Sequence, residues 1–293
     1  MHANAWYREF APCEALRPHV RTFFSFVPGA VAAASPRQLL REAGFVDLTS
    51  CSPQFGDGHA SMLFELGRTC TLDGCWQTDG NAYCGTIAGP KTAVGRIAAG
   101  DLPQMLGVLF RPGARVGSLL GVPVRALTNR AIQIVEAWGN DAKSLPIELA
   151  ELDEAGRIDR IEAILLQRLA SPRKERTTTV NAEGLAASAL RRRGRITVEA
   201  MAGAGGVSRQ HLTREFHDRL GITPKLYCRL ARFQSGLAYA GFGEAVDWAQ
   251  IAAAMGYADQ SHLIAEFREF GGMTPHQLAS QDWFHPFIAR ARD

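Results

Sequence analysis

One short segment of the chain concentrates side chains that can hydrogen-bond to phosphates and to base edges. The members are Arg209, Gln210, Thr213, Arg214 and His217. Their spacing of one and three residues would place them on one side of a helix. Guanidinium and imidazole groups contact phosphate oxygens, while amide, hydroxyl and guanidinium groups read base edges in a groove. The chemistry that this segment suggests is recognition of nucleic acid.

The apolar residues of the same segment predict a buried side opposite the polar one. Leu212 and Phe216 are four residues apart, so they share one face of a helix. Glu215 is predicted to lie away from the polar face, so that no acidic residue shares it.

This pattern occurs a second time in the chain at a fixed distance. The first copy comprises Leu212, Phe216, Gly221 and Thr223-Pro224, and the second comprises Leu263, Phe267, Gly272 and Thr274-Pro275. The differences 263 minus 212 and 267 minus 216 both equal 51. Internal duplication is the usual cause of such regularity.

Each copy is predicted to be a pair of helices with a tight glycine turn. The first helices cover Thr197 to Gly205 and Asp247 to Met255, and Ala202 and Ala252 stand four positions before Gly206 and Gly256. A small residue, a glycine turn and apolar anchors on the next helix form the layout of a helix-turn-helix unit. Ser208 and Asp259 are the expected N-caps of the two second helices.

A long helix is predicted to join the two units, from Pro224 to about Tyr239. Its inward face would consist of Tyr227, Leu230, Phe233 and Leu237. At about 1.5 Å per residue this helix spans roughly 24 Å, which suits two reading helices near the ~34 Å separation of successive major grooves. Four arginines precede the first unit, and they either hold phosphates or form a solvated helix end. They are Arg191, Arg192, Arg193 and Arg195.

The first part of the chain has a different texture, in which glycine and proline interrupt short apolar runs. Ser61 to Leu66 and Met105 to Phe110 are two such runs, so a mostly antiparallel β-domain of barrel or sandwich type is expected. Helices are predicted to close it at 116–120, 131–138, 145–152 and 157–169. An isoleucine- and leucine-rich stripe in the last of these indicates packing on its own domain or, alternatively, pairing with a second copy.

The expected fold class is α+β with two domains. Residues 1–170 would form the β-rich domain with its flanking helices, 171–181 a linker, 182–283 an all-α double helix-turn-helix domain, and 284–293 a tail. The hydrophobic share of 46%, the charged share of 21% and the net charge of +3 are those of an ordinary globular protein. Six cysteines without a Cys-x-x-Cys pair, and the lack of a targeting or membrane-spanning segment, predict a cytoplasmic protein that does not associate with membranes.

Rival chemistries have weaker support in the sequence. His19 and His59 lack the close histidine partner of a metal-binding barrel, so neither a metal nor another cofactor is predicted. No nucleophile or phosphate-loop motif appears, so the chain is not predicted to be an enzyme. Cys70, Cys75 and Cys84 leave open a redox or soft-metal sensor. A second alternative is an architectural DNA binder that responds to no effector.

The C-terminal part resembles the AraC/XylS family of bacterial transcription regulators from about Ala182 to Leu278. The sequence segments that show this resemblance are Gly206–Phe216, Gly221–Lys225, Met255–Leu263, Phe267 and Gly272–Pro275. More weakly, Ile87–Pro90, Phe110–Gly113 and Leu119–Pro123 are similar to sensor domains of one branch of that family.

The resemblance implies a set of DNA-binding residues and partners. Base reading would fall on Gln210, Thr213 and Arg214 in the first unit and on Gln260, Ser261 and Ile264 in the second. Ala265 replaces a frequent basic residue, so the second unit is expected to read bases less strongly. Further expected contacts are Ser208, Arg209, His217, Asp259 and Arg268. The expected partners are double-stranded DNA, RNA polymerase, an unidentified small-molecule effector and a second copy of the chain.

The role of Arg214 can be tested by its replacement with alanine. Arg214→Ala should weaken binding to the preferred duplex by about 1–3 kcal/mol and relax base preference at one position. The measurement is a comparison of the sequences that the parent and the variant select from a random duplex library. Equal base preference in both would contradict the assignment.

Overall fold

The computed structural model describes residues 7–26, 52–54, 58–66, 83–93, 95–97, 104–113, 115–171, 180–240 and 247–279. The predicted tail 284–293, most of the predicted linker, and Cys70 and Cys75 lie outside these ranges.

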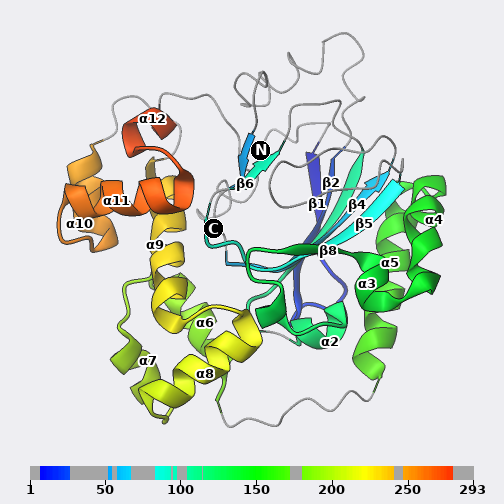
Figure 1. Ribbon diagram of the computed structural model, residues 1–293, viewed down its shortest axis with the longest axis horizontal. Helices are drawn as coiled ribbons and strands as arrows, with labels where there is room; N and C mark the ends of the chain where they lie inside the picture. Colours follow the sequence, from blue (N-terminus) through cyan, green and yellow to red (C-terminus); the bar gives the residue numbers. More distant parts are fainter. Residues whose placement is uncertain are drawn as a thin grey trace.

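The first part of the chain contains all the strands and several short helices (Figure 1). The strands are β1 (Tyr7–Phe10), β2 (Val20–Phe26), β3 (Ser52–Gln54), β4 (Ser61–Leu66), β5 (Tyr83–Ala88), β6 (Gly95–Ile97), β7 (Met105–Phe110) and β8 (Ala131–Gln133). The helices are α2 (Val116–Leu120), η1 (Val124–Ala126), α3 (Ile134–Trp138), η2 (Asn140–Ser144), α4 (Leu145–Glu151) and α5 (Glu154–Ala170).

Among the described residues of the second part, helices are the only regular secondary structure. Its elements are α6 (Ala182–Arg191), α7 (Val198–Ala204), α8 (Arg209–Leu220), α9 (Pro224–Ala240), α10 (Trp248–Met255), α11 (Gln260–Gly271) and α12 (Pro275–Ala279).

Six strands form one antiparallel sheet in the order β1-β2-β7-β4-β5-β8, and β3 pairs separately with β6. The two predicted apolar runs are strands β4 and β7, which are central neighbours with Met62 opposite Val108. Helices α3, α4 and α5 lie together beside this sheet (Figure 1). The predicted α+β class with a β-rich first part and an all-α second part is confirmed.

The barrel alternative is wrong, because the sheet is open. Among the described strands, β1 and β8 stand at opposite ends of the sheet and do not pair with each other. Glycine and proline turns limit the length of each strand. They do not determine whether the first strand meets the last, which depends on the tilt and stagger of the whole sheet.

The helix predicted over 131–138 is also partly wrong. Ala131–Gln133 forms strand β8, with Ile132 opposite Ile87 of β5, and only Ile134–Trp138 is helical. The apolar spacing of this short segment fits either structure. Pairing with the edge of β5 favours a strand here, because it satisfies the backbone hydrogen-bonding groups of both strands.

The core of the first part lies between the sheet and its helices. Three strands contribute the completely buried side chains of Phe23, Phe64 and Phe110. Helix α5 contributes Ile161 and Leu165 to the same cluster. The stripe on α5 therefore packs on its own domain, which is one of the two interpretations left open by the sequence.

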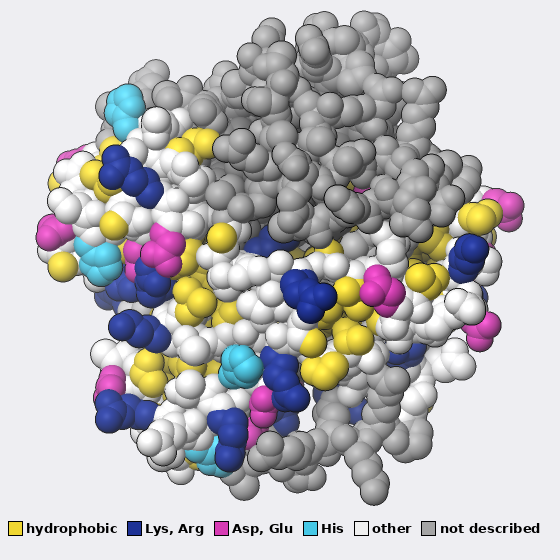
Figure 2. All heavy atoms as spheres, in the orientation of Figure 1, with side chains coloured by type: hydrophobic (Ala, Val, Ile, Leu, Met, Phe, Trp, Pro, Cys, Tyr) yellow, Lys and Arg dark blue, Asp and Glu magenta, His cyan; other side chains and the backbone are white. Residues whose placement is uncertain are grey.

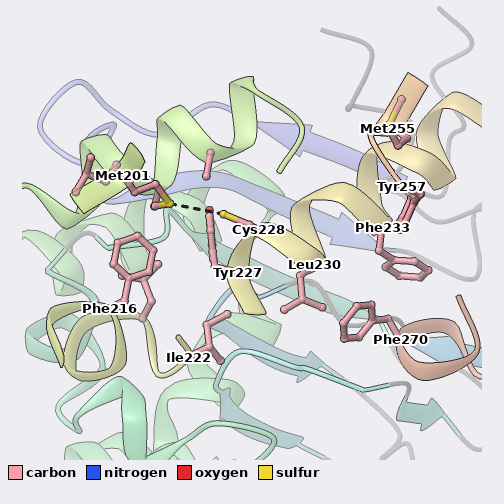
Figure 3. Packing of buried hydrophobic residues seen from close by; sticks show 14 of the residues in the cluster. Met201, Phe216, Ile222, Tyr227, Cys228, Leu230, Phe233, Met255, Tyr257 and Phe270 are labelled. Atoms are coloured by element: carbon pink, nitrogen blue, oxygen red, sulfur yellow. Dashed lines mark hydrogen bonds between the residues drawn. The ribbon is translucent and has the colours of Figure 1, made fainter. Parts of the chain in front are cut away.

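The second part has a separate core that surrounds α9. Tyr227, Leu230, Phe233 and Leu237 are buried along one side of this helix, as predicted. Phe216 of α8 stands edge-on to Tyr227 at 6.0 Å between ring centroids, and Phe267 of α11 stands edge-on to Phe233 at 5.0 Å. Figure 3 shows the labelled side chains of both units converging on α9. One helix thus provides core residues to both helix-turn-helix units.

None of the helices in the described ranges combines the length and apolarity that crossing a bilayer requires.

The two apolar anchors should each be essential for the stability of the second part. Leu212 and Phe267 are 0% exposed, so Leu212→Ala should cost about 2–5 kcal/mol and Phe267→Ala about 3–5 kcal/mol of unfolding free energy. Chemical denaturation followed by circular dichroism measures this loss. Leu190→Ala is the control, because Leu190 is 36% exposed, and a cost equal to that of Phe267→Ala would refute the packing described.

Candidate nucleic-acid interface

Helix α8 is the second helix of the first unit, and its ends are built as the sequence predicts. Ser208 precedes it with extended backbone, and its hydroxyl accepts a hydrogen bond from the His211 amide at 3.2 Å. At the other end Gly221 adopts a φ of +75°, which stops the helix in the left-handed region. The Thr223 hydroxyl then accepts from the Leu226 amide and starts α9.

The polar side of α8 faces away from the core. Arg209, Gln210, Arg214 and His217 are exposed, while Thr213 is half-buried and donates its hydroxyl to the Arg209 carbonyl at 2.8 Å. Figure 2 shows basic side chains, with His and acidic side chains among them, on the part of the surface where α8 lies in Figure 1. The structure therefore brings together the predicted reading residues of the first unit.

The prediction that no acidic residue shares this surface is wrong in two places. Arg209 forms an ion pair of 2.8 Å with Glu199 of α7, and its guanidinium holds the pKa of Glu199 below its ordinary value. Asp218 lies 4.0 Å from His217. Glu215 itself is buried, as expected. Spacing within α8 does not report Glu199, which comes from the neighbouring helix α7, whereas Asp218 directly follows His217 on α8 itself.

Helix α11 is the corresponding helix of the second unit. The Asp259 carboxylate accepts from the His262 amide at 2.8 Å and caps the helix, and Gly272 ends it with a φ of +71°. Gln260, Ser261 and Arg268 are exposed, whereas Ile264 is half-buried and packs on the core. Of the predicted contact residues, four are therefore exposed on α8 and three on α11.

The arginine cluster before the first unit divides into two kinds. Arg191, Arg192 and Arg193 are exposed where α6 ends. Arg195 instead donates to the Ala254 carbonyl at the end of α10, at 2.9 Å. It thereby connects the segment before α7 to the second unit, a structural role that neither of the two interpretations of this cluster included.

The turn between α6 and α7 is packed tightly against α9. A Cβ atom built on Gly194 would lie 2.0 Å from the Cys228 carbonyl oxygen, which no other residue type could tolerate. Gly194 also has a φ of +71°. The first unit therefore depends on glycine here for the close approach of two backbones.

Buried ion pairs are the feature that the sequence analysis missed. Glu266 of α11 is 1% exposed and accepts from the Arg229 Nε of α9 at 2.8 Å. Arg229 also binds Glu269, and Arg232 lies 3.6 Å from Glu266. A signal was available, because Glu215 and Glu266, like His211 and His262, differ by the same 51 positions as the apolar anchors.

The first unit also contacts the β-rich part of the chain. Arg125 of η1 forms an ion pair of 2.7 Å with Asp218 of α8, and the Thr128 hydroxyl donates to the Gly221 carbonyl at 2.8 Å. A Cβ built on Gly221 would lie 2.5 Å from that hydroxyl, so the two surfaces are in close contact. Gly58 lies against Ile222 and Leu230 on the apolar side of this contact.

The two reading helices lie toward opposite ends of α9 (Figure 1). α9 contains 17 residues, which corresponds to about 25 Å at a rise of ~1.5 Å per residue. This length is compatible with insertion of α8 and α11 into successive major grooves, whose centres are about 34 Å apart.

Two rival chemistries find no support in the described ranges. No group of three or more potential metal-ligating side chains comes together there. Burial raises the pKa of the Cys228 thiol to about 11, so this cysteine is a protonated filler beside Met201. Cys84 lies in β5, while Cys70 and Cys75 lie outside the described residues.

Two protein-family models match the chain. A model of a helix-turn-helix domain matches residues 201–281, and a model described as a domain of unknown function (DUF6597) matches residues 8–133. Among curated proteins, no significant match was found.

Solved structures with some similarity to the chain include ToxT and CuxR. Apo ToxT from Vibrio cholerae, as a point variant, is 14% identical, with a TM-score of 0.43 over 80% of this chain and 95% of its own. ToxT bound to an unsaturated fatty acid is 15% identical, with a TM-score of 0.41 over 79% and 90%. The AraC-like transcriptional activator CuxR is 14% identical, with a TM-score of 0.19 over 71% and 70%.

With TM-scores this low, the assignment rests on the helix-turn-helix match and on the geometry of the two units. Both units have the capped second helix, the left-handed glycine stop and the exposed polar face described above. By this C-terminal domain, whose helix-turn-helix units are of the AraC type, the chain is a DNA-binding transcription regulator.

Proposed function

We propose that the chain reads a specific DNA sequence with α8 and α11 and that its β-rich domain modulates this reading in response to a small molecule. The observation on which the first statement depends is the pair of capped helices with exposed polar faces at two ends of one rigid spacer. Helices of this kind enter the major groove with their N-terminal residues at base edges.

In the first unit, base reading is assigned to Gln210, Thr213 and Arg214. Gln210 and Arg214 are exposed and suit bidentate contacts to adenine and guanine. The Thr213 hydroxyl donates its proton to its own helix, so in this rotamer it can only accept a hydrogen bond from a base. Arg209 and His217 are assigned to phosphates, and Arg209 would exchange its solvent-exposed partner Glu199 for a phosphate.

In the second unit, Gln260 and Ser261 are assigned to base edges, while Ile264 can offer only apolar contact to a thymine methyl group. Arg268 is assigned to a phosphate. Ser208 and Asp259 act mainly as caps, and the helix N-termini that they complete attract phosphate oxygens. The first unit would therefore contribute more sequence specificity than the second.

The contact between η1 and α8 supports control by the β-rich domain. Asp218 is adjacent in sequence to His217, so the ion pair with Arg125 lies beside a side chain assigned to DNA. A change in the β-rich domain that moves η1 would alter the charge and position of this end of α8. A small molecule that binds the β-rich domain more tightly in one position of η1 than in another would shift the equilibrium between the two conformations. The effector, RNA polymerase and a second copy of the chain are proposed partners on the basis of the family resemblance.

An architectural role is the competing function, and DNA selection separates the two. The full chain should enrich a site of about 20 base pairs from a random duplex library, with an affinity that falls steeply as salt rises. Binding of equal strength to the enriched and the unselected duplexes would indicate an architectural binder.

Arg125→Ala tests the coupling between the domains. Loss of the Arg125 charge removes one ion-pair partner of Asp218 and increases the net negative charge beside the end of α8 assigned to DNA, so the affinity of the full chain for the selected duplex should fall roughly two- to fivefold. Fluorescence anisotropy measures this change. Addition of Asp218→Ala should restore most of the affinity.

Arg130→Ala is the matched control, because it removes the same charge from an exposed position five residues away. Equal losses for Arg125→Ala and Arg130→Ala would refute a specific coupling through Asp218.

A further inference from the structure

The two helix-turn-helix units are equivalent in sequence but are held in place differently. Glu215 and Glu266 occupy the same position of the repeat, and both carboxylates are buried, at 5% and 1% exposed. In the described structure, the ionic partners of Glu215 are His211 and Arg219, both on α8 itself. Those of Glu266 include Arg229 and Arg232, which belong to α9.

Arg229 of α9 contacts three different side chains of α11. The Arg229 Nε donates to Glu266 at 2.8 Å, and its two terminal nitrogens donate to the two carboxylate oxygens of Glu269. Its guanidinium also lies 4.8 Å from the centre of the Phe270 ring. A planar group with three fixed contacts of this kind restricts rotation as well as separation of the two helices.

Arg232 adds a second connection, to the turn that precedes α11. Its guanidinium lies 4.9 Å from the centre of the Tyr257 ring and donates to the Gly256 carbonyl at 3.4 Å. Burial and the neighbouring Glu266 carboxylate raise the pKa of Tyr257, so its hydroxyl stays protonated. The helix, its turn and the spacer are therefore connected through one buried carboxylate.

Because the network is largely buried, it is less screened by salt than an exposed pair. Buried ion pairs contribute little net stability compared with apolar replacements, but they can select one geometry. Here the ion pairs would select the angle and the separation of α11 relative to α9, and hence relative to α8.

We propose that Glu266 and Arg229 are positioning residues that hold α11 at one orientation on α9 and thereby determine the half-site spacing that the chain accepts. This inference rests on the proposed DNA reading by α8 and α11. Neither residue needs to touch DNA, since both act through Gln260 and Ser261 on the exposed side of the same helix.

The first experiment measures the geometry without DNA. Spin labels are introduced as non-canonical amino acids at positions 210 and 260 of the full chain, and the distance distribution between them is recorded by pulsed electron spin resonance. The parent should give a narrow distribution, and Glu266→Gln should broaden it. Glu215→Gln is the matched control, because it alters the equivalent carboxylate without a partner on α9, and it should leave the width unchanged.

The second experiment measures spacing on duplexes that the parent chain has selected from a random library. Insertion of one base pair between the half-sites rotates them by about 34°, which should reduce parent binding roughly tenfold or more. Glu266→Gln should reduce this discrimination to about threefold or less, whereas Glu215→Gln should retain it.

Glu269→Gln is a second variant of the same network, in case Glu266→Gln fails to fold. It should fold, because Glu269 is 51% exposed and its loss leaves no buried group unpaired. It should show an intermediate effect in both experiments. If Glu266→Gln and Glu269→Gln both keep the parent's distribution and spacing discrimination, the proposal is overturned. Failure of the parent to select any duplex would overturn the proposed function, and the distance measurement would still decide whether Glu266 and Glu269 hold α11 at one orientation on α9.

Discussion

The packing of two units on one shared helix is the constraint on which the DNA-binding domain depends. α9 buries Tyr227 against Phe216 of the first unit and Phe233 against Phe267 of the second. Each unit alone is too small to bury its apolar face, so neither is expected to be stable without the spacer. The separation of the two reading helices is therefore determined by the same residues that stabilise the fold.

The duplicated units have diverged in what surrounds them. The first lies against the β-rich domain through Asp218 and Gly221, and the second is joined to α9 through Glu266. Most of the basic and imidazole side chains assigned to DNA are on the first unit, which has Arg209, Arg214 and His217, whereas the second has Arg268. In this arrangement the unit proposed to read more bases is also the one open to control, while the other provides a fixed reference.

Much of the DNA-binding domain could be predicted from local rules. The approximate bounds of α7, α8, α10 and α11, the caps Ser208 and Asp259 and the left-handed glycines follow from residue types at helix ends, where the chemistry is set within a few residues. The buried face of α9 followed from its periodicity. By contrast, Glu199 beside Arg209 and the Arg195 contact with α10 join segments far apart in sequence, and no periodicity reports such contacts.

The sequence by itself determined the duplication, the positions of helices α7 to α11 and of strands β4 and β7, and the residues of α8, α9 and α11 that face the core, because each depends on spacing along a single segment. Only the tertiary structure decided that the sheet stays open, that Ala131–Gln133 is a strand, and that Glu266 pairs with α9 while Glu215 does not. These features depend on which surfaces meet after the chain has folded. The free energy of such a contact depends on two segments together, so it cannot be predicted from the sequence of either one alone.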